Sequence, residues 1–190
     1  EECNQALDEA QGMFSNLLTK NYPTDKAVFD DLNSLQILIE KTVYHAGLVA
    51  YVFPKEDMRK SGEVCEQKFT SFISELNLSR ALYDKIAQTK VDKLTEIDRR
   101  YREKTLQNFR LSGVNLDQYE REQVKLLQDE IVALGQTFDR NIRESEAYLE
   151  LKNALDLAGL PQDYIDRHKP SSDGIIKIST KSTDYFPFMQ

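Results

Sequence analysis

The feature that most constrains this chain is a repeated three-and-four spacing of apolar residues, which is typical of helices that bury one side. The first such stripe consists of Cys3, Ala6, Leu7, Ala10, Met13, Phe14, Leu17 and Leu18. Only 7 glycines and 5 prolines interrupt 190 residues, and this composition favours long helices over a turn-rich β fold. The sequence therefore predicts a mainly α protein, a bundle of about six helices.

The second predicted helix follows a break at residues 21–23, and Thr24 is placed to cap it. Its stripe consists of Val28, Phe29, Leu32, Leu35, Ile39, Val43 and Gly47, and continues toward Tyr51. Around residues 36–39 and 48–53 apolar side chains nearly encircle the helix, which predicts a position in the centre of the bundle. The small residues expected to let a neighbouring helix approach closely are Ala46, Gly47 and Ala50.

Three more helices are expected between residues 54 and 113. Pro54 suits the first turn of the third helix, Ser79 is placed to cap a short fourth, and Ser112-Gly113 ends the fifth. Ser61-Gly62 is likewise interpreted as helix punctuation. The apolar residues of these helices are Met58, Val64, Cys65, Phe69, Phe72, Ile73 and Leu76, then Leu82, Tyr83 and Ile86, then Leu94, Ile97, Tyr101 and Phe109.

The sixth predicted helix begins at Asp117 and Glu120, which are spaced like a capping box. Its stripe is Val124, Leu127, Ile131, Leu134, Phe138 and Ile142. Because this spacing is close to a heptad seam, we expect a long antiparallel hairpin with the fifth helix.

The pattern changes after about Arg143. Residues 148–151 and 174–180 are expected to form short strands, and Gly159-Leu160-Pro161 begins a brief helical turn between them. The sequence thus predicts one helical domain over residues 1–190, in which residues 148–190 form a β-containing segment with a small hairpin or ribbon.

The net charge and the short apolar runs argue against nucleic acid and membranes as partners. The net charge of -7 repels nucleic acid and acidic lipid surfaces, and no apolar run reaches the roughly 18 to 20 residues that span a bilayer. We expect a soluble protein whose compartment, cytoplasmic or periplasmic, stays open. Cys3 and Cys65 match no C-x-x-C pattern; buried thiols are the main interpretation and one disulfide is the alternative.

No residue is predicted to be catalytic, to bind a cofactor or to ligate a metal. His45 and His168 are the only histidines, and neither belongs to an H-E-x-x-H or Glu-x-x-His pattern. His45 is expected to be a hydrogen-bonded core or groove histidine. For the acidic pairs Glu1-Glu2 and Asp30-Asp31, nothing in the sequence indicates an apolar pocket that would separate their pKa values for acid and base roles.

A basic cluster and an aromatic tail each allow more than one interpretation. The basic residues are Arg99, Arg100, Arg102 and Lys104. They either bind an anion or peptide carboxylate or, as we expect, cover a solvated helix face. The aromatic tail, Tyr185 to Met189, needs something to pack against, so we expect it to be disordered, folded back, or buried against another copy.

Several segments taken together resemble the amino-terminal region of the thimet oligopeptidase and oligopeptidase A family. They are Cys65-Glu66, Ser71 to Ser79, Leu82-Tyr83, Asn108 to Val114, Leu134 to Ile142, Leu157 to Pro161 and Tyr185 to Met189. Their order and spacing follow the family over nearly the whole chain.

The resemblance implies a non-catalytic helical domain that forms one wall of a channel for oligopeptide substrates. It implies that zinc, the H-E-x-x-H helix and a further glutamate ligand belong to a catalytic domain, the partner of this chain, that lies beyond Gln190. Substrate-binding residues within this chain remain unassigned. Two alternatives stay open: a free-standing helical module that binds a protein partner, and a small enzyme that uses a pair of carboxylates.

Overall fold

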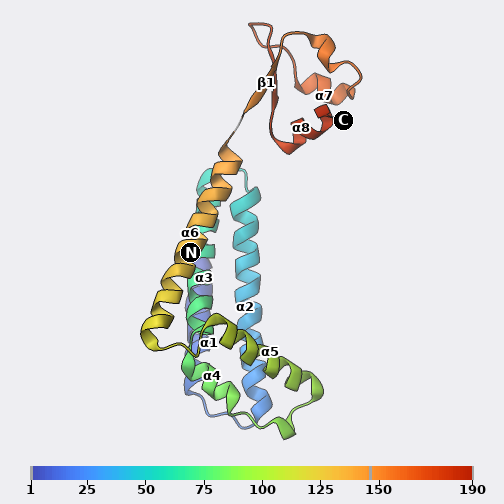
Figure 1. Cartoon of the computed structure of the whole chain (residues 1–190). Coiled ribbons are helices and arrows are strands. Elements are labelled where there is room, and N and C mark those ends of the chain that lie inside the picture. The colour runs from blue at the N-terminus through green and yellow to red at the C-terminus, as the bar shows by residue number, and fades with distance from the viewer. Residues whose placement is uncertain (1, 146, 190) are drawn as a thin grey trace. The chain divides into compact units, whose positions relative to one another are not determined.

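We describe the protein from a computed structural model, which describes residues 2–145 and 147–189 (Figure 1). The chain divides into two compact units, Glu1–Gln136 and Thr137–Gln190. In the described residues eight α-helices and a two-stranded sheet form the secondary structure. The predicted mainly α fold is confirmed.

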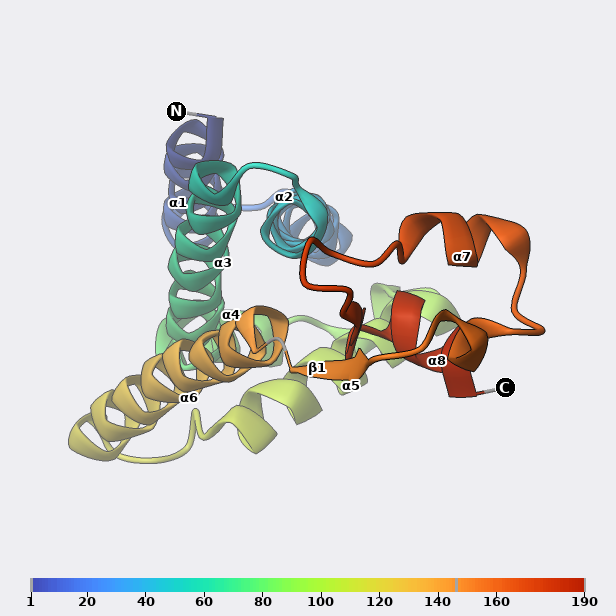
Figure 2. The ribbon, with the colours of Figure 1, turned by 90° about the horizontal axis from the view of Figure 1, so that it is seen from above.

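Three helices make up half of the first unit: α1 (Glu2–Thr19), α2 (Asp25–Val52) and α3 (Glu56–Asn77). Figure 2 shows α2 nearly end-on beside α1 and α3. The predicted cap of α2 is confirmed, because the Thr24 side chain accepts a hydrogen bond from the amide of Ala27. Pro54 precedes α3, which has Lys55 as its N-cap. The prediction that Pro54 lies in the first turn is wrong by two residues.

Helices α2 and α3 approach each other closely at Gly62. A Cβ atom added there would lie 2.7 Å from the carbonyl oxygen of Ala46 and 2.8 Å from the amide nitrogen of Ala50. The prediction that small residues of α2 allow close approach is confirmed at Ala46 and Ala50, whereas Gly47 faces open space. The interpretation of Ser61-Gly62 as punctuation is wrong, since Gly62 lies inside α3, where its missing side chain admits the backbone of α2.

The next two helices each have a side-chain cap at the amino-terminal end. Ser79 accepts a hydrogen bond from the amide of Leu82 at the start of α4 (Arg80–Ala87), as predicted. A 3-10 turn, η1 (Val91–Lys93), leads to α5 (Glu96–Ser112), which begins with a reciprocal capping box between Thr95 and Asp98. Gly113 ends α5 with φ 100°, a left-handed conformation that favours glycine. Ser112-Gly113 is therefore a helix end, as predicted.

The core of the first unit lies where α1 to α5 meet. Its largest fully buried side chains are Leu17, Leu32, Leu35, Phe69, Leu82, Ile86 and Val114. The predicted central position of the carboxyl-terminal half of α2 is wrong: Tyr44 is 75% exposed and Leu48 is 60% exposed. The 28-residue α2 is longer than the 18-residue α1, and α3 covers only the side of α2 that carries Ala46 and Ala50.

The cysteines form a disulfide that joins α1 to α3. Cys3 and Cys65 are bonded, with a Cα–Cα distance of 5.9 Å, across a sequence separation of 62 residues. The main interpretation of the sequence, two buried thiols, is wrong, and the alternative is correct. One stripe residue near the start of α1 and one in the middle of α3 face each other, which the spacing of two distant cysteines in a sequence does not reveal.

Helix α6 (Gln118–Glu144) begins with the predicted capping box. The Glu120 amide donates to the Asp117 side chain, and the Asp117 amide donates to the Glu120 side chain. The predicted apolar hairpin with α5 is wrong, because Leu127, Ile131 and Leu134 are each more than half exposed. The hydrogen bonds that hold α6 in the first unit go instead from its polar side to α3.

The second unit contains the small sheet. Strands β1 (Tyr148–Leu151) and β2 (Ile176–Ser179) pair antiparallel, with Tyr148 opposite Ser179, which confirms the predicted ribbon. The 3-10 turn η2 (Ala154–Leu157) and helix α7 (Gln162–Arg167) connect the strands. The small core comprises Leu151, Leu157, Tyr164, Ile176 and Ile178.

The aromatic tail forms α8 (Ser182–Met189), which follows β2. Of the three expected outcomes, the tail is folded back within its own unit. Phe188 packs against the small core, and the Tyr164 hydroxyl donates to the carbonyl oxygen of Asp184 at 2.8 Å. Tyr185 and Phe186 stay 43% and 58% exposed.

Candidate functional site

The histidines show no metal-binding arrangement. His45 lies on α2 and is exposed. Of the two expected positions, core or groove, the core is therefore wrong, because this part of α2 lacks cover, as at Tyr44. Throughout residues 2–145 and 147–189, no group of three or more His, Cys, Asp or Glu side chains lies close enough together to hold a metal ion.

His168 has a structural environment in the second unit. Its side chain is only 8% exposed, and its Nε2 lies 3.5 Å from the carboxylate of Asp184. Its Nδ1 lies 2.9 Å from the carbonyl oxygen of Tyr164, on whose ring it stacks. Ser179 donates its hydroxyl to Asp184 at 2.6 Å. The serine thus bonds to the carboxylate and not to the imidazole, so the trio does not form a serine nucleophile with a histidine base.

The acidic pair Asp30-Asp31 is divided between two different cations. Lys26 binds Asp30, and Lys20 binds Asp31 at 2.9 Å. The Lys20 ammonium holds the pKa of Asp31 below its ordinary value, with a further hydrogen bond from Tyr22. Burial, together with Asp31, raises the pKa of the Tyr22 hydroxyl to about 12. This arrangement keeps Asp31 ionised, whereas a general acid needs a raised pKa. In the other pair, Glu1 lies outside the described residues.

Two arginines of the predicted basic cluster make hydrogen bonds within the protein. Arg99 donates to the carbonyl oxygens of Val91 and Leu94, ahead of α5. Arg102 donates to the Thr89 hydroxyl and to the carbonyl oxygen of Ala87. Arg100 and Lys104 are exposed. The cluster is therefore a solvated face, two of whose arginines also donate hydrogen bonds around the α4–α5 connection.

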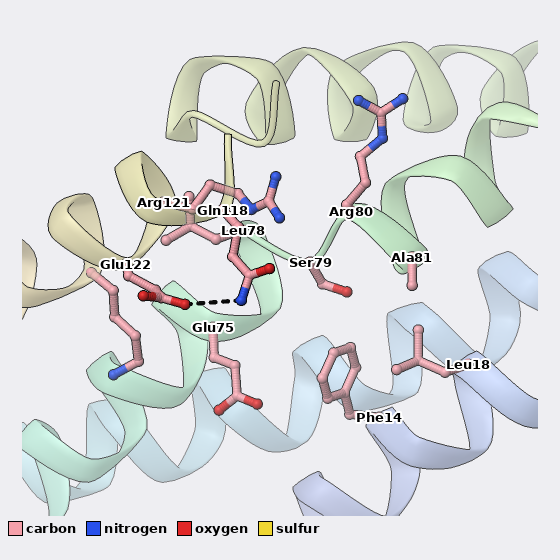
Figure 3. Close-up of a pocket in the computed structure, with 11 residues that line it drawn as sticks. Phe14, Leu18, Glu75, Leu78, Ser79, Arg80, Ala81, Gln118, Arg121 and Glu122 are labelled. Atoms are coloured by element: carbon pink, nitrogen blue, oxygen red, sulfur yellow. Dashed lines mark hydrogen bonds between the residues drawn. The ribbon is translucent and has the colours of Figure 1, made fainter. Parts of the chain in front are cut away.

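A pocket of about 430 Å³ opens in the first unit where α1, the α3–α4 connection and the start of α6 meet. Figure 3 shows Phe14 and Leu18 of α1 on one side of it, and Gln118 and Glu122 of α6 on the other. Leu78 and Ala81 add further apolar surface. The other lining residues, Glu75 among them, are polar or charged. A mixed lining of this kind accommodates a small apolar side chain or a short segment of extended peptide.

Three of the charged residues that line this pocket bind other groups of the protein. Arg80 binds Asp84, and Lys125 binds Asp129 at 2.9 Å. Arg121 donates to the carbonyl oxygen of Leu116, and Ser79 is occupied as the cap of α4. We consider the pocket as a candidate for binding.

A second candidate surface is the outer strip of α2, defined here as Ile37, Tyr44, Leu48 and Val52. Their exposed fractions are 57%, 75%, 60% and 66%. Their spacings of seven, four and four residues place them on one helix face. A strip of apolar and aromatic side chains left in water on a rigid helix is typical of an interaction surface.

No protein-family model matches the chain. In the described residues no helix is both long and apolar enough to cross a membrane.

Sequence reasoning missed both candidate surfaces. The pocket joins residues that are more than 100 positions apart, such as Phe14 and Lys125, and no local spacing reveals such a meeting. The α2 strip was visible in the sequence as apolar residues around the whole helix. The shortness of α1 relative to α2 is the signal that one side would lack cover.

Proposed function

We propose that this chain is the non-catalytic amino-terminal domain of a zinc-dependent oligopeptidase and that its helices form one wall of the peptide channel. The observation that supports this function best is the exposed outer strip of α2. An isolated domain gains nothing from leaving Tyr44 and Leu48 in water, since burying such side chains stabilises a protein by about 1.5–3 kcal/mol each. A surface that meets substrate must keep them accessible.

The chemistry of the strip fits unstructured oligopeptides. Apolar and aromatic side chains contact many different peptide side chains without selecting one sequence, and a helix holds them in fixed positions. His45, adjacent to Tyr44 and also exposed, supplies a polar group on the same stretch of α2. The wall would thus contribute shape and contact area, while a narrow channel excludes folded proteins by size.

Zinc is the metal of the oligopeptidase family that the sequence resembles. The described residues of this chain offer no set of ligands for it, so we assign no step of peptide hydrolysis to them. In the proposed enzyme the zinc and its ligands belong to the catalytic domain, where the metal supplies an activated water as the nucleophile.

The test is peptide binding by the intact 190-residue chain. A pool of unstructured oligopeptides is titrated into isotopically labelled protein, and amide chemical shifts are followed. We expect shifts along the outer strip of α2 and at least a tenfold loss of affinity, about 1.4 kcal/mol, in the Tyr44→Ser/Leu48→Ser variant.

The matched control is Ile97→Ser/Leu111→Ser, which removes apolar side chains that are 81% and 79% exposed on α5. Both variants are expected to fold normally, because none of the four side chains is buried. Equal peptide affinities for the two variants, or chemical shifts that leave α2 unaffected, would contradict the proposal.

A further inference from the structure

Helices α3 and α6 run antiparallel beside the pocket of the first unit. Lys125 of α6 donates to the hydroxyl of Ser71 of α3 at 2.6 Å. Further along α6, the Gln136 side chain donates to the carbonyl oxygen of Glu63 on α3. Residue numbers on α3 thus fall as those on α6 rise, and these contacts fix which residues of the two helices lie opposite each other.

Two opposite charges face each other at the pocket. Glu75 lies one helical turn after Ser71, and Arg121 lies one turn before Lys125, so each stays on the side of its helix that meets the other helix. Both Glu75 and Arg121 line the pocket (Figure 3). Within residues 2–145 and 147–189, however, no ion pair joins the two. The pocket therefore separates a carboxylate from a guanidinium.

Neither charge has an ionic partner elsewhere in the part of the chain that the structure describes. Arg121 donates to the carbonyl oxygen of Leu116, a neutral acceptor, and this bond leaves most of the guanidinium N–H groups for a second acceptor. Glu75 is exposed and makes no hydrogen bond to another described residue. A ligand with one positive and one negative group can bind both.

The remaining charged residues of the lining have partners. Arg80 and Lys125 are each bound to an aspartate. Glu122 accepts a hydrogen bond from the Gln118 amide at 3.1 Å, the dashed line of Figure 3. Because an amide does not cancel the charge of a carboxylate, Glu122 adds to the attraction of the pocket for a positive group.

Apolar side chains complete the pocket. Phe14, Leu18 and Leu78 supply this surface. Phe14 is held edge-on against Phe72, with 5.9 Å between ring centroids, so the apolar side is fixed by the core of the unit. The volume of about 430 Å³ lies at the lower end of the roughly 300–1,000 Å³ that is usual for small-molecule sites. The pocket therefore fits a small molecule better than a helix.

We propose that this pocket binds a free apolar α-amino acid. The ammonium group of the ligand binds Glu75, its carboxylate binds Arg121, and its side chain contacts Phe14, Leu18 and Leu78. A zwitterion with an apolar side chain matches all three features, whereas a simple cation or anion leaves one of the two charges without a charge-assisted hydrogen bond. This inference is independent of the proposed peptidase function, because it uses only the geometry and charges of the pocket.

The experiment is a titration of the isotopically labelled, intact chain with leucine, followed by amide chemical shifts. Two blocked derivatives are titrated in parallel: N-acetyl-leucine lacks the ammonium group, and leucine amide lacks the carboxylate. We expect leucine to cause saturable shifts at the residues that line the pocket. Each derivative should bind roughly tenfold more weakly or worse, since each loses one hydrogen bond between charged groups.

Substitutions assign each ligand group to its partner. Glu75→Gln and Arg121→Gln should each weaken leucine binding roughly tenfold. Glu75→Gln should leave the affinity for N-acetyl-leucine unchanged, and Arg121→Gln should leave that for leucine amide unchanged, because the corresponding ligand charge is already absent. The matched controls are Glu103→Gln and Arg100→Gln, which change exposed residues of α5 outside the pocket and should bind leucine normally.

Two results would overturn the proposal. The first is the absence of saturable shifts with leucine. The second is equal affinity for leucine and both blocked derivatives, which would mean that the pocket selects an apolar side chain alone, as within a peptide. Circular dichroism verifies the fold of each variant, and the titrations with blocked derivatives decide the matter on the unmodified chain.

Discussion

At the scale of single residues, glycine 62 has the clearest structural role. Gly62→Ala places a Cβ within 3 Å of two backbone atoms of α2, and a helix backbone cannot move aside as a flexible side chain does. We predict a loss of about 1–3 kcal/mol in the free energy of unfolding, measured by chemical denaturation.

Gly12→Ala is the control. Gly12 also lies within a helix, but its added Cβ meets nothing within 4 Å, so alanine should stabilise by about 0.5–1 kcal/mol. Equal effects at both positions would contradict this packing.

A second residue-scale prediction concerns acid sensitivity in the second unit. The Ser179 hydroxyl, with a further contribution from His168, holds the pKa of Asp184 below its ordinary value. The ionised carboxylate therefore stabilises the folded unit fully above the ordinary pKa of about 4, and this contribution disappears as pH falls through the lower folded pKa. The protection of the β2 and α8 amides against hydrogen exchange, corrected for the intrinsic pH dependence of exchange, should fall in that window. Asp184→Asn should remove this part of the acid response, and an unchanged pH profile in that variant would refute the assignment.

At the scale of elements, the disulfide is the strongest covalent constraint. It closes a loop of 62 residues between α1 and α3, which lowers the entropy of the unfolded chain and corresponds to about 4 kcal/mol. We predict that Cys3→Ser/Cys65→Ser loses stability of this order in chemical denaturation without reductant. Two alkylatable thiols in the unreduced, denatured protein would show that the bond is absent.

Helix ends could be predicted from the sequence, and helix environments could not. Thr24, Ser79 and Gly113 act as the boundaries that their local chemistry indicates, because a cap bonds to amides within three residues. Burial of Tyr44 or Leu127 depends on which neighbouring helix lies opposite. An apolar stripe shows that a helix face needs a partner, and it does not show whether that partner lies in the same unit. The polar bonds of Gln136 to α3 decided the orientation of α6, and they have no periodic signature.

At the scale of the whole molecule, the sequence predicts one domain, and the structure has two compact units with separate cores. The change of pattern at about Arg143 lies close to the division after Gln136. The second core has five buried apolar residues, far fewer than the first. A small core supports little stability on its own. The pocket and the α2 strip both lie in the first unit, where a larger core holds them in place.

The central claim is that this helical chain functions as a wall of a zinc oligopeptidase. The most direct test is to isolate the native gene product from its source cells with an antibody to this chain, and then to measure its mass and its cleavage of short peptides. We predict a product several-fold larger than 22.0 kDa that hydrolyses oligopeptides, loses activity to a chelator and recovers it with zinc. A product near 22.0 kDa, or a larger one without chelator-sensitive hydrolysis, would contradict the claim.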